Sequence, residues 1–312
     1  MVVEALIGGT PSVRAEIPLS PEEILSKKGE WFIDITTSML VDHDVRIDVS
    51  PPTSFEISPE RIIDIPGTTT IKEQEARRLT SSVGVTHAFT SRLEAALDMV
   101  WDFSSTNHRV GDSNSSNHDT DFRNLSFGLN WLVVKEDSHP AVVATFDTVV
   151  LEKDEIILFE KVLRDRVWFR SFSVGTAIYR QLDPVVLSGN LSYQLGLDRK
   201  IENVRFRPGE VGAWSLIVIF AANERLSISS GISGAVRRSE KIRGSRVGTT
   251  RNDVSLIGGI SLVLSSVWYT TVSIEGGLTD LAPDAVITFK IARRFKKNKI
   301  ENLKGGDEKE KF

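Results

Sequence analysis

One stretch near the end of the chain, residues 268–295, restricts the fold most strongly: WYTTVSIEGGLTDLAPDAVITFKIARRF. Each of its two arms places apolar residues at alternate positions, such as Val272 and Ile274 in the first arm and Ile287 and Phe289 in the second. A period of two gives a β-strand one apolar face and one polar face. The letters TDLAPD between the arms are turn-forming residues. The stretch therefore predicts a β-hairpin whose apolar face meets either a protein core or lipid.

The same alternation recurs along the chain and predicts twelve strands in all. They are residues 31–41, 78–87, 93–103, 125–133, 141–150, 168–182, 185–195, 211–221, 226–236, 254–264 and the two arms of the last hairpin. Polar or charged composition predicts loops in the long joints. These expected loops are residues 47–75, 111–119, the charged stretch through Asp165, the residues around 205–208, and 237–251.

The lengths of the joints decide between the two environments. Joints after odd-numbered strands are long and joints after even-numbered strands are short, with the short joint after strand eleven as the exception. Outer-membrane barrels have an even number of antiparallel strands, short periplasmic turns and long external loops. Strands of about ten residues also suffice to cross the apolar layer when tilted. Aromatic residues near strand ends would suit an interfacial girdle: Trp31, Trp101, Trp131, Trp168, Trp214, Trp268 and Phe295.

We therefore expect an all-β fold, namely a twelve-stranded antiparallel transmembrane β-barrel with a short N-terminal helix. It would lie in the bacterial outer membrane with both termini in the periplasm. A soluble β-sandwich is the alternative, because its strands would also alternate if their apolar faces packed on each other.

Composition excludes several other classes. A content of 40% hydrophobic residues and a net charge of −4 fit both a soluble protein and a barrel. No run of 18 apolar residues exists, which excludes helical membrane spans. The chain has no cysteine, its five histidines lack metal-ligand spacing, and no GxSxG motif is present. We expect neither an enzyme nor a metal or cofactor site, and no nucleic-acid partner.

The chain outside the strands divides into three parts. Residues 1–19 show no period and are expected to form a mobile arm without the basic start of a signal peptide. Residues 20–29, SPEEILSKKG, predict a short helix, because the first residues can cap it and the glycine can end it. Residues 30–295 would form the barrel, and residues 296–312 a charged tail that we expect to be disordered.

Four sequence words carry a resemblance to a known family. They are WFIDITTSML, DPVVLSGNLSYQL, FAANERLSISSGIS and GLTDLAPDAVITF, spread from Trp31 to Phe295. They resemble the outer-membrane secretion channel of the functional-amyloid (Fap) system of Pseudomonas. More loosely, they resemble the wider family of twelve-stranded outer-membrane transporters related to the porins of aromatic degradation. The NERLS turn and the GLTD…APD hairpin are the most specific words and mark the wider family best.

The resemblance implies a homotrimeric barrel in outer-membrane lipid that exports an unfolded, amyloid-type polypeptide. It also implies that a short helix before the first strand plugs the pore. On this sequence the plug falls on Pro21, Glu22, Glu23, Ile24, Leu25, Lys27 and Lys28. The chain departs from the family in two ways: few residues precede this helix, where the family has a periplasmic coiled coil and linker, and the chain continues beyond Phe295.

A polar inner face would keep water in such a pore and let an extended chain slide through it. The candidate pore-lining residues are Asp34, Arg78, Glu94, Asp98, Asp102, Asn130, Asp147, Asn190, Gln194, Glu275, Lys290 and Arg294. Glu94, Asp98 and Asp102 would form an acidic stripe about 27 Å long, which favours cations, basic peptide segments, or the plug's Lys27 and Lys28. Passive uptake of small solutes, aromatic ones among them, is the alternative function, and an apolar ladder in the lumen would favour it.

Overall fold

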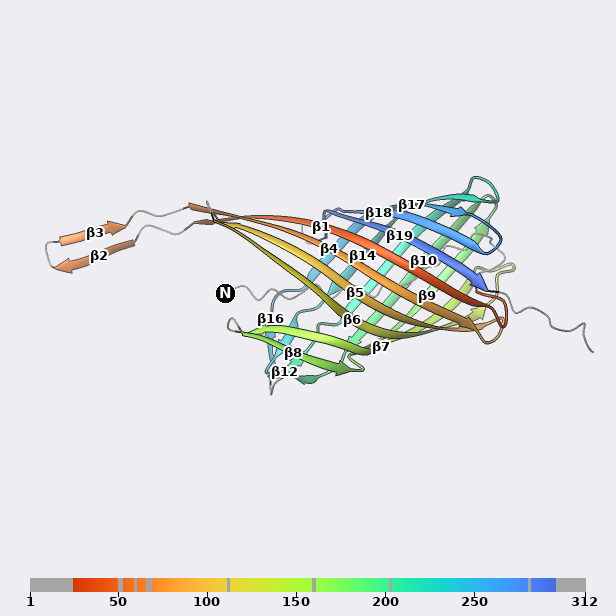
Figure 1. Ribbon diagram of the computed structural model, residues 1–312, viewed down its shortest axis with the longest axis horizontal. Helices are drawn as coiled ribbons and strands as arrows, with labels where there is room; N and C mark the ends of the chain where they lie inside the picture. Colours follow the sequence, from red (N-terminus) through yellow and green to blue (C-terminus); the bar gives the residue numbers. More distant parts are fainter. Residues whose placement is uncertain are drawn as a thin grey trace, which may run out of the picture.

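The computed structural model describes residues 25–49, 53–58, 61–65, 69–110, 113–158, 161–201, 204–279 and 282–295. They form a closed antiparallel β-barrel of twelve strands (Figure 1). The barrel strands are β1 (Trp31–Val49), β4 (Thr69–Ala88), β5 (Leu93–Val110), β6 (Ser113–Val134), β7 (Ala141–Leu158), β9 (Ser171–Leu182), β10 (Val185–Gly196), β13 (Val211–Ala221), β14 (Leu226–Arg237), β17 (Arg251–Val263), β18 (Trp268–Gly277) and β19 (Ala285–Phe295).

Seven shorter strands lie in the links between barrel strands. They are β2 (Thr53–Ser58), β3 (Arg61–Ile65), β8 (Lys161–Trp168), β11 (Arg199–Ile201), β12 (Val204–Arg207), β15 (Glu240–Ile242) and β16 (Ser245–Val247). Neighbouring barrel strands pair in chain order, and β1 closes the ring onto β19. This seam runs without a register shift from the pair Trp31 and Phe295 to the pair Val41 and Ala285. The barrel therefore has no open sheet edge, as a membrane-spanning sheet requires.

The predicted fold class is confirmed, and each of the twelve predicted strands overlaps one barrel strand. Short turns gather at one end of the barrel: residues 89–92, 135–140, 183–184, 222–225 and 264–267. The opposite end carries the long hairpins (Figure 1), apart from the link between β18 and β19, whose shortness the sequence also predicts. Since outer-membrane barrels keep their short turns in the periplasm, we assign the short-turn end to the periplasm and the long-hairpin end to the outside.

Much of the expected loop sequence is paired instead of irregular. β1 and β4 remain paired as far as Val49 and Thr69, with the β2–β3 hairpin between them. The polar tract 111–119 belongs mostly to β6, which pairs with β5 up to Ser113 and Val110. The other expected loops hold β8 and the four-stranded sheet β11-β12-β15-β16. Outside the membrane both faces of a hairpin meet water, so the apolar alternation stops while the backbone ladder continues.

The strand predicted at 168–182 crosses the junction between two strands that run in the same direction. Trp168 ends β8 and Phe172 lies on β9, and both strands run antiparallel to β7, β8 along Leu151–Leu158 and β9 along Ala141–Thr148. Phe169 lies at the junction with a φ of 50°, a left-handed conformation that interrupts the regular strand.

A β-bulge lies at the end of the predicted strand 141–150. Leu125 pairs with Leu151 and Ser126 pairs with Val149, so Val150 is an extra residue in β7. An extra residue exchanges the inward and outward faces of the strand beyond it. Val143 on one side of the bulge and Glu152 on the other are therefore both buried, although their numbers differ in parity.

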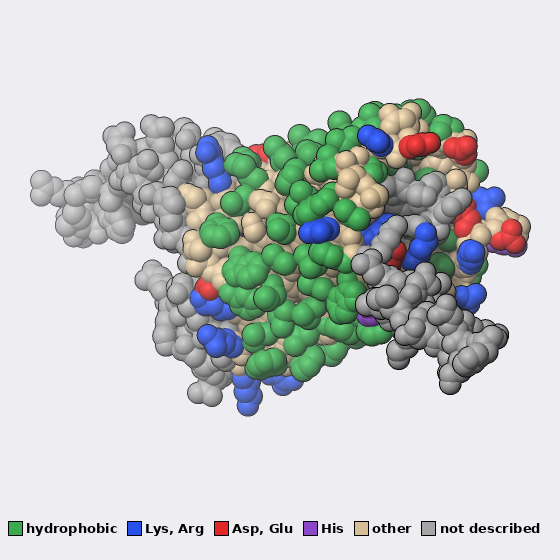
Figure 2. Space-filling model, turned by 45° about the vertical axis from the view of Figure 1, so that its right-hand side comes forward, with side chains coloured by type: hydrophobic (Ala, Val, Ile, Leu, Met, Phe, Trp, Pro, Cys, Tyr) green, Lys and Arg blue, Asp and Glu red, His purple; other side chains and the backbone are tan. Residues whose placement is uncertain are grey.

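The outside of the barrel is apolar. Its exposed large side chains include Ile35 on β1, Leu191 on β10, Leu216 on β13, Ile260 on β17 and Phe289 on β19. Figure 2 shows hydrophobic side chains covering the middle of the molecule, with most charged side chains toward its two ends. An apolar belt of this extent needs lipid around it. The barrel is therefore a bacterial outer-membrane protein. Among the described residues, no helix is long and apolar enough to cross a membrane.

Aromatic side chains mark the periplasmic rim of this belt. The Trp31 ring stacks on the His87 ring at a centroid distance of 4.1 Å. The Arg293 guanidinium lies 5.3 Å from the centroid of the Trp268 ring and 4.6 Å from that of Phe295. Amphipathic rings beside cationic groups are typical of the membrane–water interface.

The close approach of β13 and β14 requires a glycine and gives a first prediction. A Cβ on Gly231 would lie 2.3 Å from the carbonyl oxygen of Leu216 and 2.9 Å from the Cα of Ile217. We expect Gly231→Ala to lower the free energy of unfolding by roughly 1–3 kcal/mol, because two backbones must separate. Urea unfolding of the barrel in lipid vesicles measures this.

Gly212 provides the matched control on β13. A Cβ at Gly212 would meet nothing within 4 Å. Gly212→Ala should therefore change the free energy of unfolding by less than about 0.5 kcal/mol. Equal losses in the two variants would contradict the steric explanation.

Candidate functional site

The inner wall of the barrel is the candidate site, because it is the surface that anything crossing the barrel must meet. On β10, β14 and β17 the inward positions carry small polar side chains. The buried ones are Ser188, Asn190, Ser192, Ser227, Ser229, Ser255 and Ser261. Strand alternation places them opposite the lipid-facing leucines and isoleucines of the same strands. These buried positions therefore offer short hydroxyl and amide groups without formal charge.

The opposite part of the wall, on β1 and β4 to β7, carries charged groups. Asp34 on β1 is only 1% exposed, and Thr36 Oγ1 donates a hydrogen bond to its Oδ2 at 3.3 Å. Gly84 of β4 lies between Asp34 and Asp98 of β5 in the strand register. Because glycine has no side chain, the space between the two carboxylates stays open, whereas a larger residue would fill it.

Glu94 holds two parts of the chain together near the periplasmic end. Its Oε1 accepts a hydrogen bond from Asn130 Nδ2 at 3.0 Å, across the β5–β6 pair. Its Oε2 accepts one from the backbone N–H of Ser26 at 3.2 Å. Lys27 and Lys28, which the sequence offers as partners of the acidic stripe, are exposed. The contact between stripe and N-terminal segment at Glu94 therefore uses a backbone amide.

Asp102, at the outer end of the expected stripe, has an arginine partner. Val100 pairs with Asn124 and Trp101 with Phe122, so Arg123 is an extra residue in β6. Arg123 Nη1 lies 2.9 Å from Asp102 Oδ2, and Thr80 Oγ1 donates to Asp102 Oδ1 at 2.7 Å. Such bulges commonly redirect a side chain. The bulge thus partly neutralises the stripe, which the alternation alone could not reveal.

The other candidate residues lie at separate heights around the wall. A Cβ on Gly128 would lie only 2.7 Å from Asp147 Oδ1, so this glycine leaves room for the carboxylate. Gln194 Nε2 donates to Ser171 Oγ at 2.9 Å, and Ser233 Oγ donates to Glu275 Oε1 at 3.2 Å.

Four candidates remain. Asn190 Nδ2 donates to Ser215 Oγ at 3.2 Å. Arg78 is partly buried opposite Ser104 of β5, and Lys290 is partly buried opposite Thr36 of β1. The Arg294 guanidinium lies 5.0 Å from the centroid of the Phe32 ring, which is itself buried.

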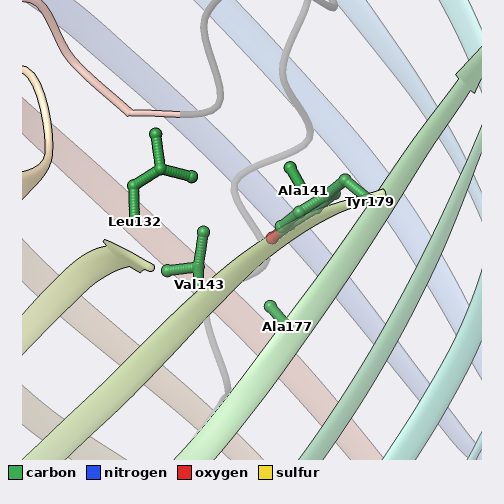
Figure 3. Close-up of a cluster of buried hydrophobic side chains, with 5 residues drawn as sticks. All are labelled: Leu132, Ala141, Val143, Ala177 and Tyr179. Atoms are coloured by element: carbon green, nitrogen blue, oxygen red, sulfur yellow. The ribbon is translucent and has the colours of Figure 1, made fainter. Parts of the chain in front are cut away.

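An apolar patch on the wall was not foreseen from the sequence. It consists of Leu132, Ala141, Val143, Ala177 and Tyr179, on β6, β7 and β9 close to the periplasmic turns (Figure 3). We call it the apolar patch. Leu25, which precedes the barrel in sequence, packs against it. The available signal was the parity of Ala141 and Val143, which is that of the inward candidate Asp147 in the same strand.

Backbone hydrogen bonds fix the residues that follow Leu25. Gly29 N–H donates to Ala88 O at 2.7 Å, and Ala88 N–H donates to Glu30 O at 3.1 Å. Lys27 N–H donates to Glu30 Oε2 at 3.1 Å. Residues 25–29, predicted as the end of a helix, form a bend and a turn instead. Pairing with Ala88 requires an extended exit from this turn into β1, which a helix does not provide.

The other plug candidates, Pro21, Glu22, Glu23 and Ile24, lie outside the described residues, as do the expected arm 1–19 and tail 296–312. Within the described ranges, no group of three or more histidine, cysteine, aspartate and glutamate residues could hold a metal ion.

Solved structures of outer-membrane proteins have a similar fold. No family model matches the chain. The chain is similar to the crystal structure of an outer membrane channel from Pseudomonas putida F1, with a TM-score of 0.61 and 10% identity over 87% of this chain and 97% of that chain. It is less similar to the transport unit of the autotransporter AIDA-I from Escherichia coli, with a TM-score of 0.49 and 10% identity over 87% and 91% of the two chains. It is also less similar to the toluene transporter TodX of P. putida, with a TM-score of 0.44 and 10% identity over 87% and 91%. The first similarity shows that the chain has the fold of an outer membrane channel.

Proposed function

We propose that this protein is an outer-membrane channel that exports an unfolded polypeptide and is closed by its own N-terminal segment. The observation that carries the export proposal is the hydroxyl-rich inner wall of β10, β14 and β17. An extended peptide needs partners for its backbone N–H and C=O groups, and serine hydroxyls both donate and accept. Partners of this kind, all weak and similar, allow a chain to move without a deep binding well.

The closing device is the segment around Leu25 and Ser26. Leu25 packs on the apolar patch and Ser26 bonds to Glu94, so the segment meets β5, β6, β7 and β9 at the periplasmic end. This segment belongs to the plug, Pro21 to Lys28, that the resemblance to the Fap channels implies. A trimer, which the resemblance to the Fap channels implies, is part of this proposal.

The alternative is passive uptake of small solutes, aromatic ones among them, and the apolar patch is the observation that favours it. With Leu25 displaced, Leu132, Val143 and Tyr179 would offer such a solute an apolar contact. The patch does not continue as a ladder along the described part of the wall, where the buried residues of β10 and β17 are mainly polar. For this reason we favour a polypeptide as the cargo.

Current recordings test the export proposal, with a barrel lacking residues 1–29. An unfolded cationic peptide added on the periplasmic side should block the current in brief events that shorten as voltage rises. Glu94→Gln with Asp98→Asn should reduce the event frequency by about tenfold, because the acidic wall concentrates cations at the entrance. Capture is measured as events per unit time and concentration.

Asp183→Asn with Glu224→Gln provides the control, because both acids are exposed in periplasmic turns, away from the inner wall. This variant should retain most of the frequency of the parent barrel. Peptide events that never shorten with voltage would refute translocation. If small aromatic solutes prolonged the blocks of the current and peptides did not, the result would favour the uptake alternative.

A further inference from the structure

A basic cradle lies at the external end of the barrel, where the β12–β13 and β14–β15 links meet. It surrounds a cavity of about 400 Å³. Four cationic side chains line it, Arg207, Arg238, Lys241 and Arg246, together with one carboxylate, Glu210. The basic cradle therefore has an excess of three positive charges. Figure 2 shows Lys and Arg side chains at both ends of the molecule, including the end that carries the long hairpins.

The backbone holds the cradle in shape. A Cβ on Gly209 would lie 1.8 Å from the carbonyl oxygen of Arg238, so the two links touch at a position that admits only glycine. Arg238 N–H donates to Glu210 O at 2.9 Å. Below the links, Phe206 of β12 and Ile242 of β15 are buried in a small apolar core with Val204. The cationic side chains thus extend from a packed sheet.

The side chain of Glu210 orients two of the arginines. Its Oε2 accepts hydrogen bonds from Arg238 Nη1 at 2.7 Å and Tyr193 Oη at 2.8 Å, and Arg207 Nη2 lies 3.3 Å from Oε1. The Tyr193 hydroxyl and then the two arginines lower the pKa of Glu210, so it stays ionised at neutral pH. Lys241 and Arg246 make no ion pair within the described part of the chain, which leaves their charge available.

Tyr193 also fixes the height and direction of the cradle. It lies on β10 between Leu191 and Leu195, and all three side chains face outward and are exposed. A tyrosine in the outer part of a lipid-facing row is typical of the membrane interface. Since its hydroxyl bonds to Glu210, the basic cradle lies at the outer interface and on the lipid-facing side of the wall.

We propose that the basic cradle binds the phosphate groups of a phosphorylated glycolipid of the outer leaflet. Phosphates at that height would meet Lys241 and Arg246 directly, and the guanidinium groups of Arg207 and Arg238 give the two-pronged geometry that phosphate accepts. A soluble phosphate would share this chemistry but would gain nothing from the apolar surface around Leu191 and Leu195, which acyl chains can cover. The site does not depend on which cargo crosses the pore.

Native mass spectrometry of the full-length barrel in detergent tests the proposal, with purified bis-phosphorylated lipid A as probe. The wild type should retain lipid A, and Lys241→Gln with Arg246→Gln should weaken binding by at least about tenfold, as the loss of two charge-assisted contacts implies. Lipid A without phosphates should bind as weakly as the double variant. The same spectra report the oligomeric state.

Arg92→Gln with Arg225→Gln is the matched control, since both arginines are exposed in the short turns at the other end. It should bind lipid A as the wild type does, and the shift of unheated samples in gel electrophoresis checks that all variants are folded. Unchanged binding in the Lys241 and Arg246 variant would overturn the site. Displacement of lipid A by equimolar inorganic phosphate would overturn the lipid assignment and indicate a site for soluble phosphate.

Discussion

A barrel without residues 1–29 should conduct at a steady open level in planar bilayers, whereas the full chain should open only briefly and rarely. The physical reason is that the deletion removes the Leu25 contact with the apolar patch and the bond from Ser26 to Glu94. Strand β1 begins at Trp31, so the wall itself keeps all its strands. Single-channel conductance of the two proteins, compared under the same voltage, measures the change.

Point variants separate the closing contact from the length of the chain that is removed. Leu25 is partly buried, so Leu25→Asp should lose up to about 1.5 kcal/mol of apolar burial, which raises the open-to-closed ratio by up to about tenfold. Ser26→Pro removes the N–H that Glu94 accepts and should also favour opening. Ser26→Ala keeps that N–H and is the matched control. Identical traces for the full chain and the deletion would eliminate the N-terminal segment as the closing device.

Leu216→Arg should cost the barrel about 2–4 kcal/mol of unfolding free energy, because it places a cation in the apolar centre of the bilayer. Leu216 is 58% exposed and is the sixth of the eleven residues of β13. Leucine at this position meets acyl chains on the outside of the belt. Urea unfolding in vesicles of defined lipid measures the difference from wild type.

The neighbouring residue provides the control for this prediction. Ser215 accepts a hydrogen bond from Asn190 and therefore lies on the inner face. Ser215→Arg should cost the barrel far less, because an arginine in a water-filled lumen keeps its hydration. If both variants lost the same stability, the assignment of the lipid-facing and inner faces of β13 would be wrong.

The periodicity of the sequence predicted the barrel because the membrane imposes it. Lipid outside and water inside demand opposite side chains at successive positions, so Leu216 and Ser215 or Ile287 and Thr288 reveal their faces without knowledge of the fold. The same rule predicts an inward position for the candidate pore-lining residues, including Asp34 and Glu94. It fails beyond the membrane, where both faces meet water, and the external hairpins were therefore expected as loops.

The bulges mark the second limit of the pattern. An extra residue at Arg123 or Val150 has no distinct composition, yet it shifts every following side chain to the other face. The partner of Asp102 and the burial of Glu152 both depend on such a shift. The helix predicted at 20–29 shows the same limit of local patterns. Gly29 and Glu30 form backbone hydrogen bonds with Ala88, and residues 25–29 therefore form a bend and a turn instead of the end of a helix.

The sequence by itself determined the number of strands, their order and the surface that faces lipid, because these follow from local alternation and from the lengths of the joints. Only the tertiary structure decided which distant residues meet: Ser26 with Glu94, Leu25 with the apolar patch, and Glu210 with Tyr193 and Arg238. Such contacts depend on strand register, on bulges and on the closing of β1 against β19. Each of these joins residues far apart in the chain, and no local pattern records it.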